Sequence, residues 1–431
     1  MTESYQYHLS LIGRNYYCKR GDKNLSKNKI LKCFFVFFVL NFLLYFSIPS
    51  QIILPEHSQL SIKALPIGSF CQLTEECSTT IEKADNSVRI NSQNAGEYEY
   101  SYRLFNTIPI KQVNVSVVPK RYVIPSGETI GVKIYTKGLL VIDVSAVYAK
   151  DMTEHFPARD AGIAVGDRIM SVDGIELKTN EEFAQYINSV KTKVKLKIAR
   201  DDTEFETEIT PVMSNDNDIY KVGLWVRDST AGIGTLTCYD LQTGEYAALG
   251  HAICDSDTGE IMTVSNGGLI NCKVVSIQKA QSGKPGELTG AFSKESVGSI
   301  SENNEFGIYG TLNEEYIDMS KKPIETATRF QVKEGEAQIL CDVDGNGVKS
   351  YSVDIVKISK SDVIDNKGIV IKVTDNELLE KTGGIVQGMS GSPIIQNGRI
   401  VGAVTHVFVN DPTRGYGIFI ENMLSEAEKI K

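Results

Sequence analysis

The stretch GGIVQGMSGSPIIQNGRIVGAVTH, residues 383–406, decides how the second half of the chain folds. It places Ser390 between Gly388 and Gly391, and a proline then precedes an apolar, strand-like run. Glycine tolerates the backbone conformations that a tight turn needs. Such a turn aims the amides of Gly388 and Ser390 at one point, where they can bind a developing oxyanion. The pattern therefore predicts a nucleophilic serine in a turn between β-strands, with a plain Gly/Ser turn as the alternative.

A serine hydroxyl is a weak nucleophile and needs a neighbouring base. Three of the five histidines lie in segments predicted to be cytoplasmic, linker or part of an earlier module: His8, His57 and His155. His251 ends the run GIGTLTCYDLQTGEYAALGHAICD (232–255), which resembles the barrel hairpin of trypsin-like enzymes, so we predict His251 as the base. His406 follows the nucleophile in a strand where that fold places the wall of the substrate pocket. We expect a packed or hydrogen-bonded strand histidine there.

A third group, usually a carboxylate, should orient the imidazole and stabilise its charged form. The candidates between His251 and Ser390 include Asp342, Asp344, Asp354, Asp362, Asp365 and Asp375. Spacing does not choose among them, although the order His, Asp, Ser matches that of trypsin-like enzymes.

The surrounding residues 213–431 are rich in glycine and in short strand-like runs, and poor in long amphipathic helices. Many short strands with Gly-rich turns favour an all-β fold, and this length suits a trypsin-like double β-barrel. The run DVDGNG (342–347) looks like the start of a calcium loop, but its twelfth position is Val353 instead of a glutamate. We predict a hairpin turn there, and no metal site or cofactor.

Residues 120–212 resemble a PDZ domain, through the motif that runs from Ala161-Gly162-Ile163 to Val172-Asp173-Gly174. A PDZ domain offers an unpaired strand edge to which an extended peptide can add. The resemblance places the carboxylate-binding loop at Ile130-Gly131-Val132. The groove is then expected between the strand 132–136 and the helix 180–190. A spacer that binds nothing strongly is the alternative.

The N-terminal segment predicts membrane attachment. Residues 1–32 are polar and basic, and an apolar run begins at Cys33, so we predict a cytoplasmic tail (1–32) and a transmembrane anchor (33–54). A cleaved signal peptide is the competing interpretation. Residues 55–96 look like a linker, and residues 97–119 like a small β unit. A formal net charge of −9 makes nucleic acid an unexpected partner. Cys71 and Cys77 are close enough in sequence to form a disulfide, but two free thiols are the alternative.

The serine turn, LGHAICD and the PDZ-like module together closely resemble the stage IV sporulation protein B peptidases, over roughly residues 97–431 and the N-terminal anchor. The resemblance implies His251 as base, Asp375 as carboxylate and Ser390 as nucleophile. It also implies an enzyme that cleaves itself and acts between the two forespore membranes. Its implied substrate is the extracytoplasmic part of an inhibitory membrane protein, whose cleavage activates intramembrane processing of a sigma factor.

Two other functions fit parts of the pattern. The first is a non-catalytic, membrane-anchored PDZ scaffold or receptor on a degenerate barrel, in which Ser390 has no chemical role. The second is a stress-induced envelope protease, but such enzymes usually place the PDZ domain after the catalytic domain, which is the reverse of the order predicted here.

Overall fold

The computed structural model describes residues 48–63, 68–72, 79–84, 87–104, 107–201, 203–216, 218–359 and 365–429, with Lys32, Phe35, Val36, Phe38, Val39 and Tyr45. Almost all of the predicted tail (1–32), ten of the 22 residues of the predicted anchor (33–54) and Cys77 lie outside these residues. Among the described residues, no helix has the length and apolar character that a membrane crossing needs.

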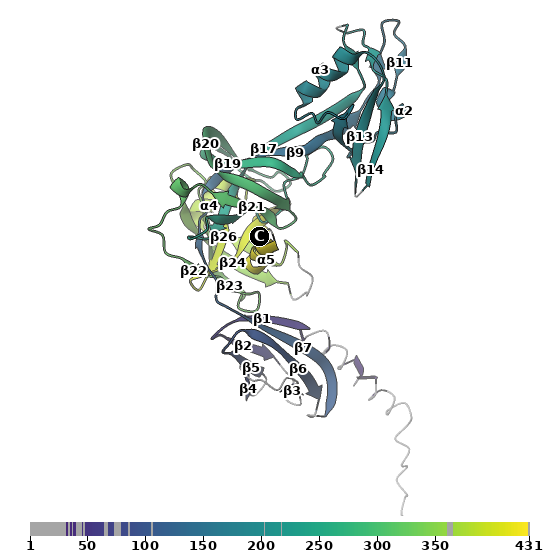
Figure 1. Cartoon of the computed structure of the whole chain (residues 1–431). Helices are drawn as coiled ribbons and strands as arrows, with labels where there is room; N and C mark the ends of the chain where they lie inside the picture. Colours follow the sequence, from purple (N-terminus) through teal and green to yellow (C-terminus); the bar gives the residue numbers. More distant parts are fainter. Residues whose placement is uncertain are drawn as a thin grey trace, which may run out of the picture.

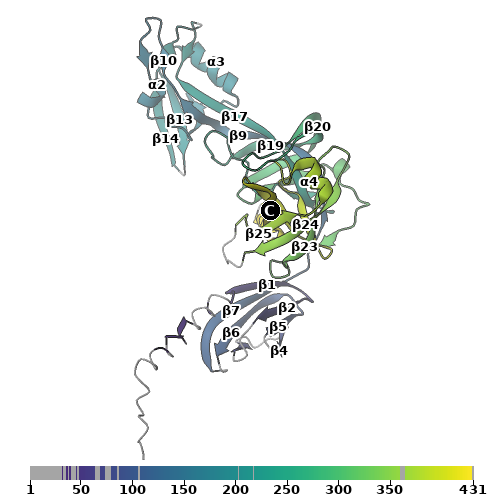
Figure 2. The same ribbon diagram turned by 180° about the vertical axis from the view of Figure 1, so that it is seen from behind.

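The described chain forms three bodies in a row, mainly of β-strands (Figures 1 and 2). An N-terminal β unit lies at one end, two β-barrels lie in the middle, and the PDZ-like module lies at the far end. The predicted mainly β fold is thus confirmed.

The N-terminal unit has a core of its own, where we predicted a linker. One sheet has the strand order β1 (Gln51–Pro55), β7 (Ile108–Val118), β6 (Gly96–Leu104), β3 (Gly68–Gln72). The other has the order β2 (Gln59–Lys63), β5 (Ser87–Ser92), β4 (Thr79–Ala84). Ile52, Leu54, Ile90 and Tyr100 are fully buried between these strands. The predicted anchor therefore does not extend to residue 54, because residues 51–54 are a buried strand.

Two long strands join the PDZ-like module to the first of the two barrels. β9 (Thr129–Val144) and β17 (Leu224–Tyr239) pair antiparallel from Leu224 opposite Val144 to Thr235 opposite Thr129. Leu139, Val141, Leu224 and Val226 in their outer halves pack in the PDZ core, whereas their inner halves are barrel strands. The PDZ module is therefore inserted into the first barrel instead of preceding it. The prediction gave the module as residues 120–212, and in the structure Val222, Leu224 and Val226 also pack in its core.

Between these strands the PDZ module contains β10 (Val147–Tyr148), β11 (Glu154–His155), α2 (Pro157–Asp160), β12 (Arg168–Val172), α3 (Asn180–Val190), β13 (Val194–Arg200), β14 (Thr203–Ile209), β15 (Val212–Met213) and β16 (Tyr220–Lys221). Helix α3 begins at the N-cap Thr179, whose side chain accepts from the Glu182 amide. As predicted from their spacing, Phe183 and Ile187 face the core.

The first barrel consists of β9, β19 (Val264–Gln278), β20 (Glu287–Asn304), β21 (Gly307–Leu312), β18 (Glu245–Ala248) and β17, and the β9–β17 pairing closes this ring. β8 (Tyr122–Pro125) and β22 (Ile324–Glu325) extend it beyond β17, and a short 3-10 helix (Glu314–Tyr316) follows β21.

The second barrel is closed by β23 (Gly335–Cys341), β24 (Lys349–Ile358), β25 (Ile369–Val373), β28 (Asp411–Phe419), β27 (Arg399–Phe408) and β26 (Pro393–Gln396). Helix α4 (Asn376–Thr382) precedes the serine turn. The C-terminal helix α5 (Ile420–Lys429) buries Ile420 and Met423 against residues of both barrels.

Candidate active site

Ser390 lies in the turn that leads into β26, and this turn is held by the first barrel. Gly388 and Gly391 have φ values of 99° and 98°, in a region that favours glycine. On β17, the Thr235 amide donates to the Ser390 carbonyl (2.9 Å) and the Thr235 hydroxyl donates to the Gly388 carbonyl (2.8 Å). The Thr237 hydroxyl donates to the Gly391 carbonyl (2.8 Å). The turn is thus fixed by a strand that lies about 150 residues away in the sequence.

The amides of the serine turn fall into two sets. Those of Gln387, Met389 and Gly391 each donate to a backbone carbonyl. For the amides of Gly388 and Ser390, no hydrogen bond is recorded within the described part of the chain. Buried amides are normally paired, so these two are available to a ligand. They are the two donors that the sequence predicts for an oxyanion.

His251 follows β18 through a turn in which Leu249 and Gly250 have φ values of 68° and 75°. Its Nδ1 lies 2.7 Å from the Ala252 carbonyl oxygen, which can only accept a hydrogen bond. This contact selects the tautomer that carries its proton on Nδ1 and leaves a lone pair on Nε2. Burial lowers the pKa of His251, which favours the neutral form that a base requires.

One pocket brings the predicted residues together. It has a volume of about 490 Å³ and is lined by His251, Gly388 and Ser390, together with Thr405 and His406. The Ser390 hydroxyl donates to the Thr405 carbonyl (2.7 Å). The structure therefore places the predicted nucleophile, base and oxyanion donors on one cavity. The hydroxyl is directed at a carbonyl group instead of the imidazole.

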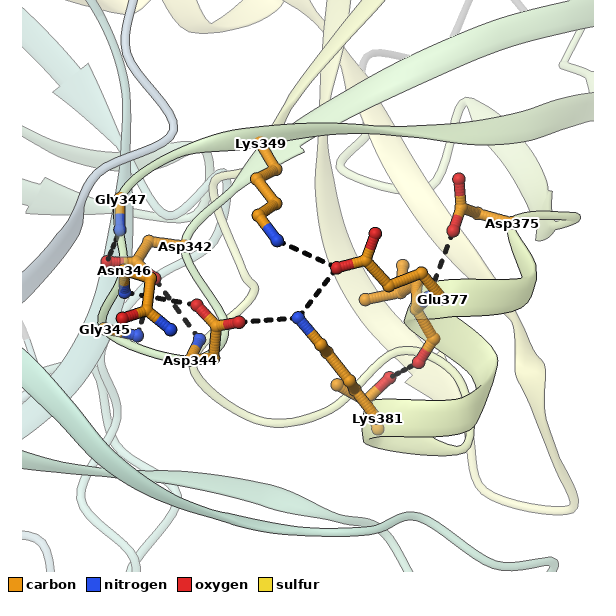
Figure 3. Close-up of polar contacts among 11 residues, drawn as sticks. Asp342, Asp344, Gly345, Asn346, Gly347, Lys349, Asp375, Glu377 and Lys381 are labelled. Carbon is orange, nitrogen blue, oxygen red and sulfur yellow. Dashed lines mark hydrogen bonds and ion pairs between the residues drawn. The ribbon is translucent and has the colours of Figure 1, made fainter.

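Asp375 is not part of this pocket, contrary to the prediction. It is the N-cap of α4, where its carboxylate accepts from the Leu378 amide (3.0 Å) (Figure 3). The same carboxylate also accepts from the Ser352 amide (3.2 Å). Aspartate is among the preferred N-cap residues because its side chain satisfies a free amide of the first helical turn. The order Asp375, Asn376, Glu377 before Leu378 carried this signal in the sequence.

The remaining candidate carboxylates also lie elsewhere. Asp342 accepts from the amides of Asp344, Gly345 and Gly347 in the turn between β23 and β24, which confirms the predicted hairpin. Asp344 pairs with Lys381, which also contacts Glu377 (Figure 3). Asp354 and Asp365 do not line the pocket, and Asp362 is outside the described residues. Within the described ranges, no group of three metal-binding side chains is present.

The loop after His251 depends on two residues that the sequence interpretation missed. The buried Asn303 side chain accepts from the Ile253 amide and donates to the carbonyls of Ile253 and Met262, each at 2.8 Å. From the PDZ side, Arg227 pairs with the buried Asp255. A buried asparagine that bonds only to backbone atoms of distant residues has no local sequence signal.

Replacing Asn303 by alanine should leave two backbone groups of this loop without partners, the Ile253 amide and the Met262 carbonyl, because the Ile253 carbonyl still accepts from the Met262 amide. Unsatisfied buried groups cost roughly 1–3 kcal/mol each, and the loop carries the base, so we expect slower peptide hydrolysis together with a lower thermal unfolding temperature. The matched control is Asn313→Ala, which removes one exposed bond to the Ser296 carbonyl. Wild-type hydrolysis by Asn303→Ala would contradict this role.

The predicted peptide-binding loop lies in the first barrel and not in the PDZ module. Ile130, Gly131 and Val132 lie in the barrel half of β9, paired with β17 on one side and β19 on the other, so their backbone cannot receive a peptide. Helix α3 lies against β16 and the first residues of β17. The Asn180 amide donates to Asp228 (3.1 Å), and the Tyr220 amide donates to the Asn188 side chain (3.0 Å). In this PDZ module α3 therefore packs against residues of β16 and β17.

Comparison with known proteins identifies two modules in the chain. Residues 218–424 match the family model "SpoIVB peptidase S55", and residues 124–210 match that of the PDZ domain. No curated protein matches the chain significantly. Among solved structures, the PDZ domain of the SdrC-like protein from Listeria monocytogenes is 26% identical and aligns over 21% of this chain and 87% of its own (TM-score 0.17).

The active form of the Rv3671c protease from M. tuberculosis is 16% identical and aligns over 47% of this chain and 74% of its own (TM-score 0.28). The inactive form of the same protease is 13% identical and aligns over 46% of this chain and 84% of its own (TM-score 0.27). The family match spans β17 to α5 and therefore contains every residue of the described pocket except Val132. The chain is a serine peptidase, and its residues 218–424 match the SpoIVB peptidase S55 family.

Proposed function

We propose that Ser390 is the nucleophile, His251 the general base, and the amides of Gly388 and Ser390 the oxyanion hole of this peptidase. The observation that carries the proposal is the common pocket, in which Ser390, His251 and two unpaired amides face the same cavity. To react, the Ser390 hydroxyl turns from the Thr405 carbonyl toward Nε2 of His251.

The reaction then follows the usual course of acyl transfer. Ser390 Oγ attacks the scissile carbonyl while His251 Nε2 takes its proton, and the negative charge forms at the oxygen beside the two amides. His251 returns the proton to the leaving amine, which frees the new N-terminus. Water then attacks the acyl-enzyme with the same base, and this step releases the second product. Each oxyanion donor of this kind contributes about 2.7–4 kcal/mol of transition-state stabilisation.

The biological role that we propose is a signal in sporulation. The enzyme, anchored through its N-terminal apolar segment, cleaves the extracytoplasmic part of an inhibitory membrane protein and so activates intramembrane processing of a sigma factor. It also cleaves itself. The family of the peptidase domain and the apolar run that begins at Cys33 support this role. The PDZ groove then tethers a substrate segment and raises its local concentration.

Active-site labelling tests the assignment of the nucleophile. A fluorophosphonate should modify the full-length protein at Ser390, as located by peptide mass spectrometry, because only an activated serine reacts readily with it. His251→Ala should abolish labelling, whereas His57→Ala, which changes an exposed turn residue, should not. A non-catalytic PDZ scaffold predicts no labelled serine, and label on a serine outside this pocket would contradict the proposed site.

A further inference from the structure

The pocket contains a second histidine for which the mechanism above has no use. The rings of His251 and His406 are 4.8 Å apart between centroids and inclined by 37°. His406 belongs to β27, but the pairing of β27 with β28 shifts between Val404 and Val407. This irregularity releases Thr405 and His406 from the regular ladder. Both line the pocket beside Ser390.

The sequence analysis expected His406 to be an ordinary packed or hydrogen-bonded strand residue, and the structure differs from that expectation. Its Nδ1 is buried and has no hydrogen-bond partner among the described residues. Such an atom is expensive to leave unpaired, because it loses its bonds to water and gains none in return. Sites of this kind need an explanation, and here the unpaired nitrogen belongs to a ring in direct contact with the predicted base.

The pocket also lacks the group that usually supports a catalytic imidazole. None of its described lining residues is an aspartate or a glutamate, and Asp375 is engaged at the start of α4. When His251 takes the proton of Ser390, the imidazole becomes positively charged, and two groups lie next to it. One is the Ala252 carbonyl on Nδ1, and the other is the ring of His406.

We propose that His406 is a positioning residue that takes the place of the triad carboxylate, holding the His251 ring toward Ser390 and stabilising its charged form. This inference rests on the proposed function of Ser390 and His251. The proton passes from Ser390 Oγ to His251 and on to the leaving amine. His406 neither gains nor loses a proton in these steps, because its role is that of a neutral dipole with an unused lone pair.

The electrostatics of the pocket agree with a neutral His406. Burial, followed by the charges of His251 and Lys367, lowers the pKa of His406 to about 4. The titratable groups that face the two rings in the described part of the chain are the rings themselves, Lys367 at the start of β25 and the Cys254 thiol on the pocket wall. None carries a negative charge near neutral pH. A proton on His251 therefore opposes a second one on His406.

The test is a pH profile of peptide hydrolysis by full-length protein carrying His406→Phe, which keeps an aromatic ring and removes both nitrogens. We expect kcat to fall by about 10- to 100-fold with little change in KM, in the range of a lost acid–base or orienting group. The acid limb of kcat/KM should also move to lower pH, because a less stabilised imidazolium releases its proton more readily. His406→Asn, which restores a lone pair, should recover part of the activity. His155→Phe, an exposed PDZ histidine, should behave as wild type.

Two results would overturn the proposal. One is full activity of His406→Phe, and the other is a reduced kcat with an unmoved acid limb, which a packing role alone explains. If His406→Phe fails to fold, as judged by thermal unfolding, His406→Leu, which also removes both nitrogens, provides the same comparison of acid limbs. Failure of the underlying mechanism is recognised separately, because fluorophosphonate would then not label Ser390 in the wild-type protein.

Discussion

Replacing Ser390 by alanine is expected to lower peptide hydrolysis by at least about 10⁴-fold and to abolish self-cleavage, while the fold stays intact. Removing the nucleophile of a serine hydrolase leaves only the contribution of the oxyanion hole and of substrate binding. The structural effect should be small, since the hydroxyl makes one hydrogen bond, to the Thr405 carbonyl, in a half-exposed position. The measurements are hydrolysis of a peptide substrate and the appearance of chain fragments on a gel.

A serine outside the pocket provides the control. Ser350 lies exposed on β24, where its hydroxyl bonds to the Gln338 side chain, and Ser350→Ala should retain wild-type hydrolysis. Identical fragments from purified wild type and Ser390→Ala would show that another group cleaves the chain. The assignment of the nucleophile would then be wrong.

Replacing Gly391 by alanine should be the most damaging single-methyl change in the serine turn. Gly391 has a φ of 98°, which L-residues adopt only with strain. An added Cβ would overlap the Thr235 carbonyl oxygen and lie 2.6 Å from the Leu249 amide nitrogen. Both obstacles are backbone atoms of the first barrel, so relief requires moving the turn away from β17. We expect a loss of more than about 3 kcal/mol of unfolding free energy, together with loss of hydrolysis.

Gly398→Ala is the matched comparison, because Gly398 has a φ of 73° but no heavy atom within 4 Å of an added Cβ. Gly398→Ala should lose only about 1–2 kcal/mol of unfolding free energy, from the strain of a non-glycine residue in the left-handed region, and should remain active. Urea unfolding of the two variants measures the difference between them. Equal stabilities would mean that the contact between the serine turn and β17 does not hold the site.

The features that the sequence predicted correctly depend on local patterns. The glycines around Ser390 impose their own turn, and the spacing of Phe183 and Ile187 identifies the buried face of α3. The assignment of Asp375 came from a family resemblance, and the local N-cap signal competed with it. Ile130 was misplaced for a different reason, because an apolar strand looks the same whether a barrel or a PDZ edge receives it.

The sequence predicted the strands of residues 97–119, but it missed those within residues 55–96, because these strands are short and their turns are polar. The segments SQLS and NSQN read as linker, yet parts of them lie in paired strands whose partners are distant in the sequence. Tyr98, Tyr100 and Tyr102 alternate as a strand should, and the structure shows that they form one side of a core with Ile52 and Leu54. Which strands pair across a core is non-local information that one sequence does not reveal.

The insertion of the PDZ module has a consequence for the order in which the protein folds. The barrel halves of β9 and β17 are neighbours in space but are separated by about 90 residues, and closing a flexible loop of that length costs about 4 kcal/mol of chain entropy. If the inserted module folds first, its own collapse brings the two strands together and this entropic barrier is removed from barrel assembly. Nucleation in the PDZ module should therefore precede closure of the first barrel, and the catalytic centre should be among the last parts of the chain to form.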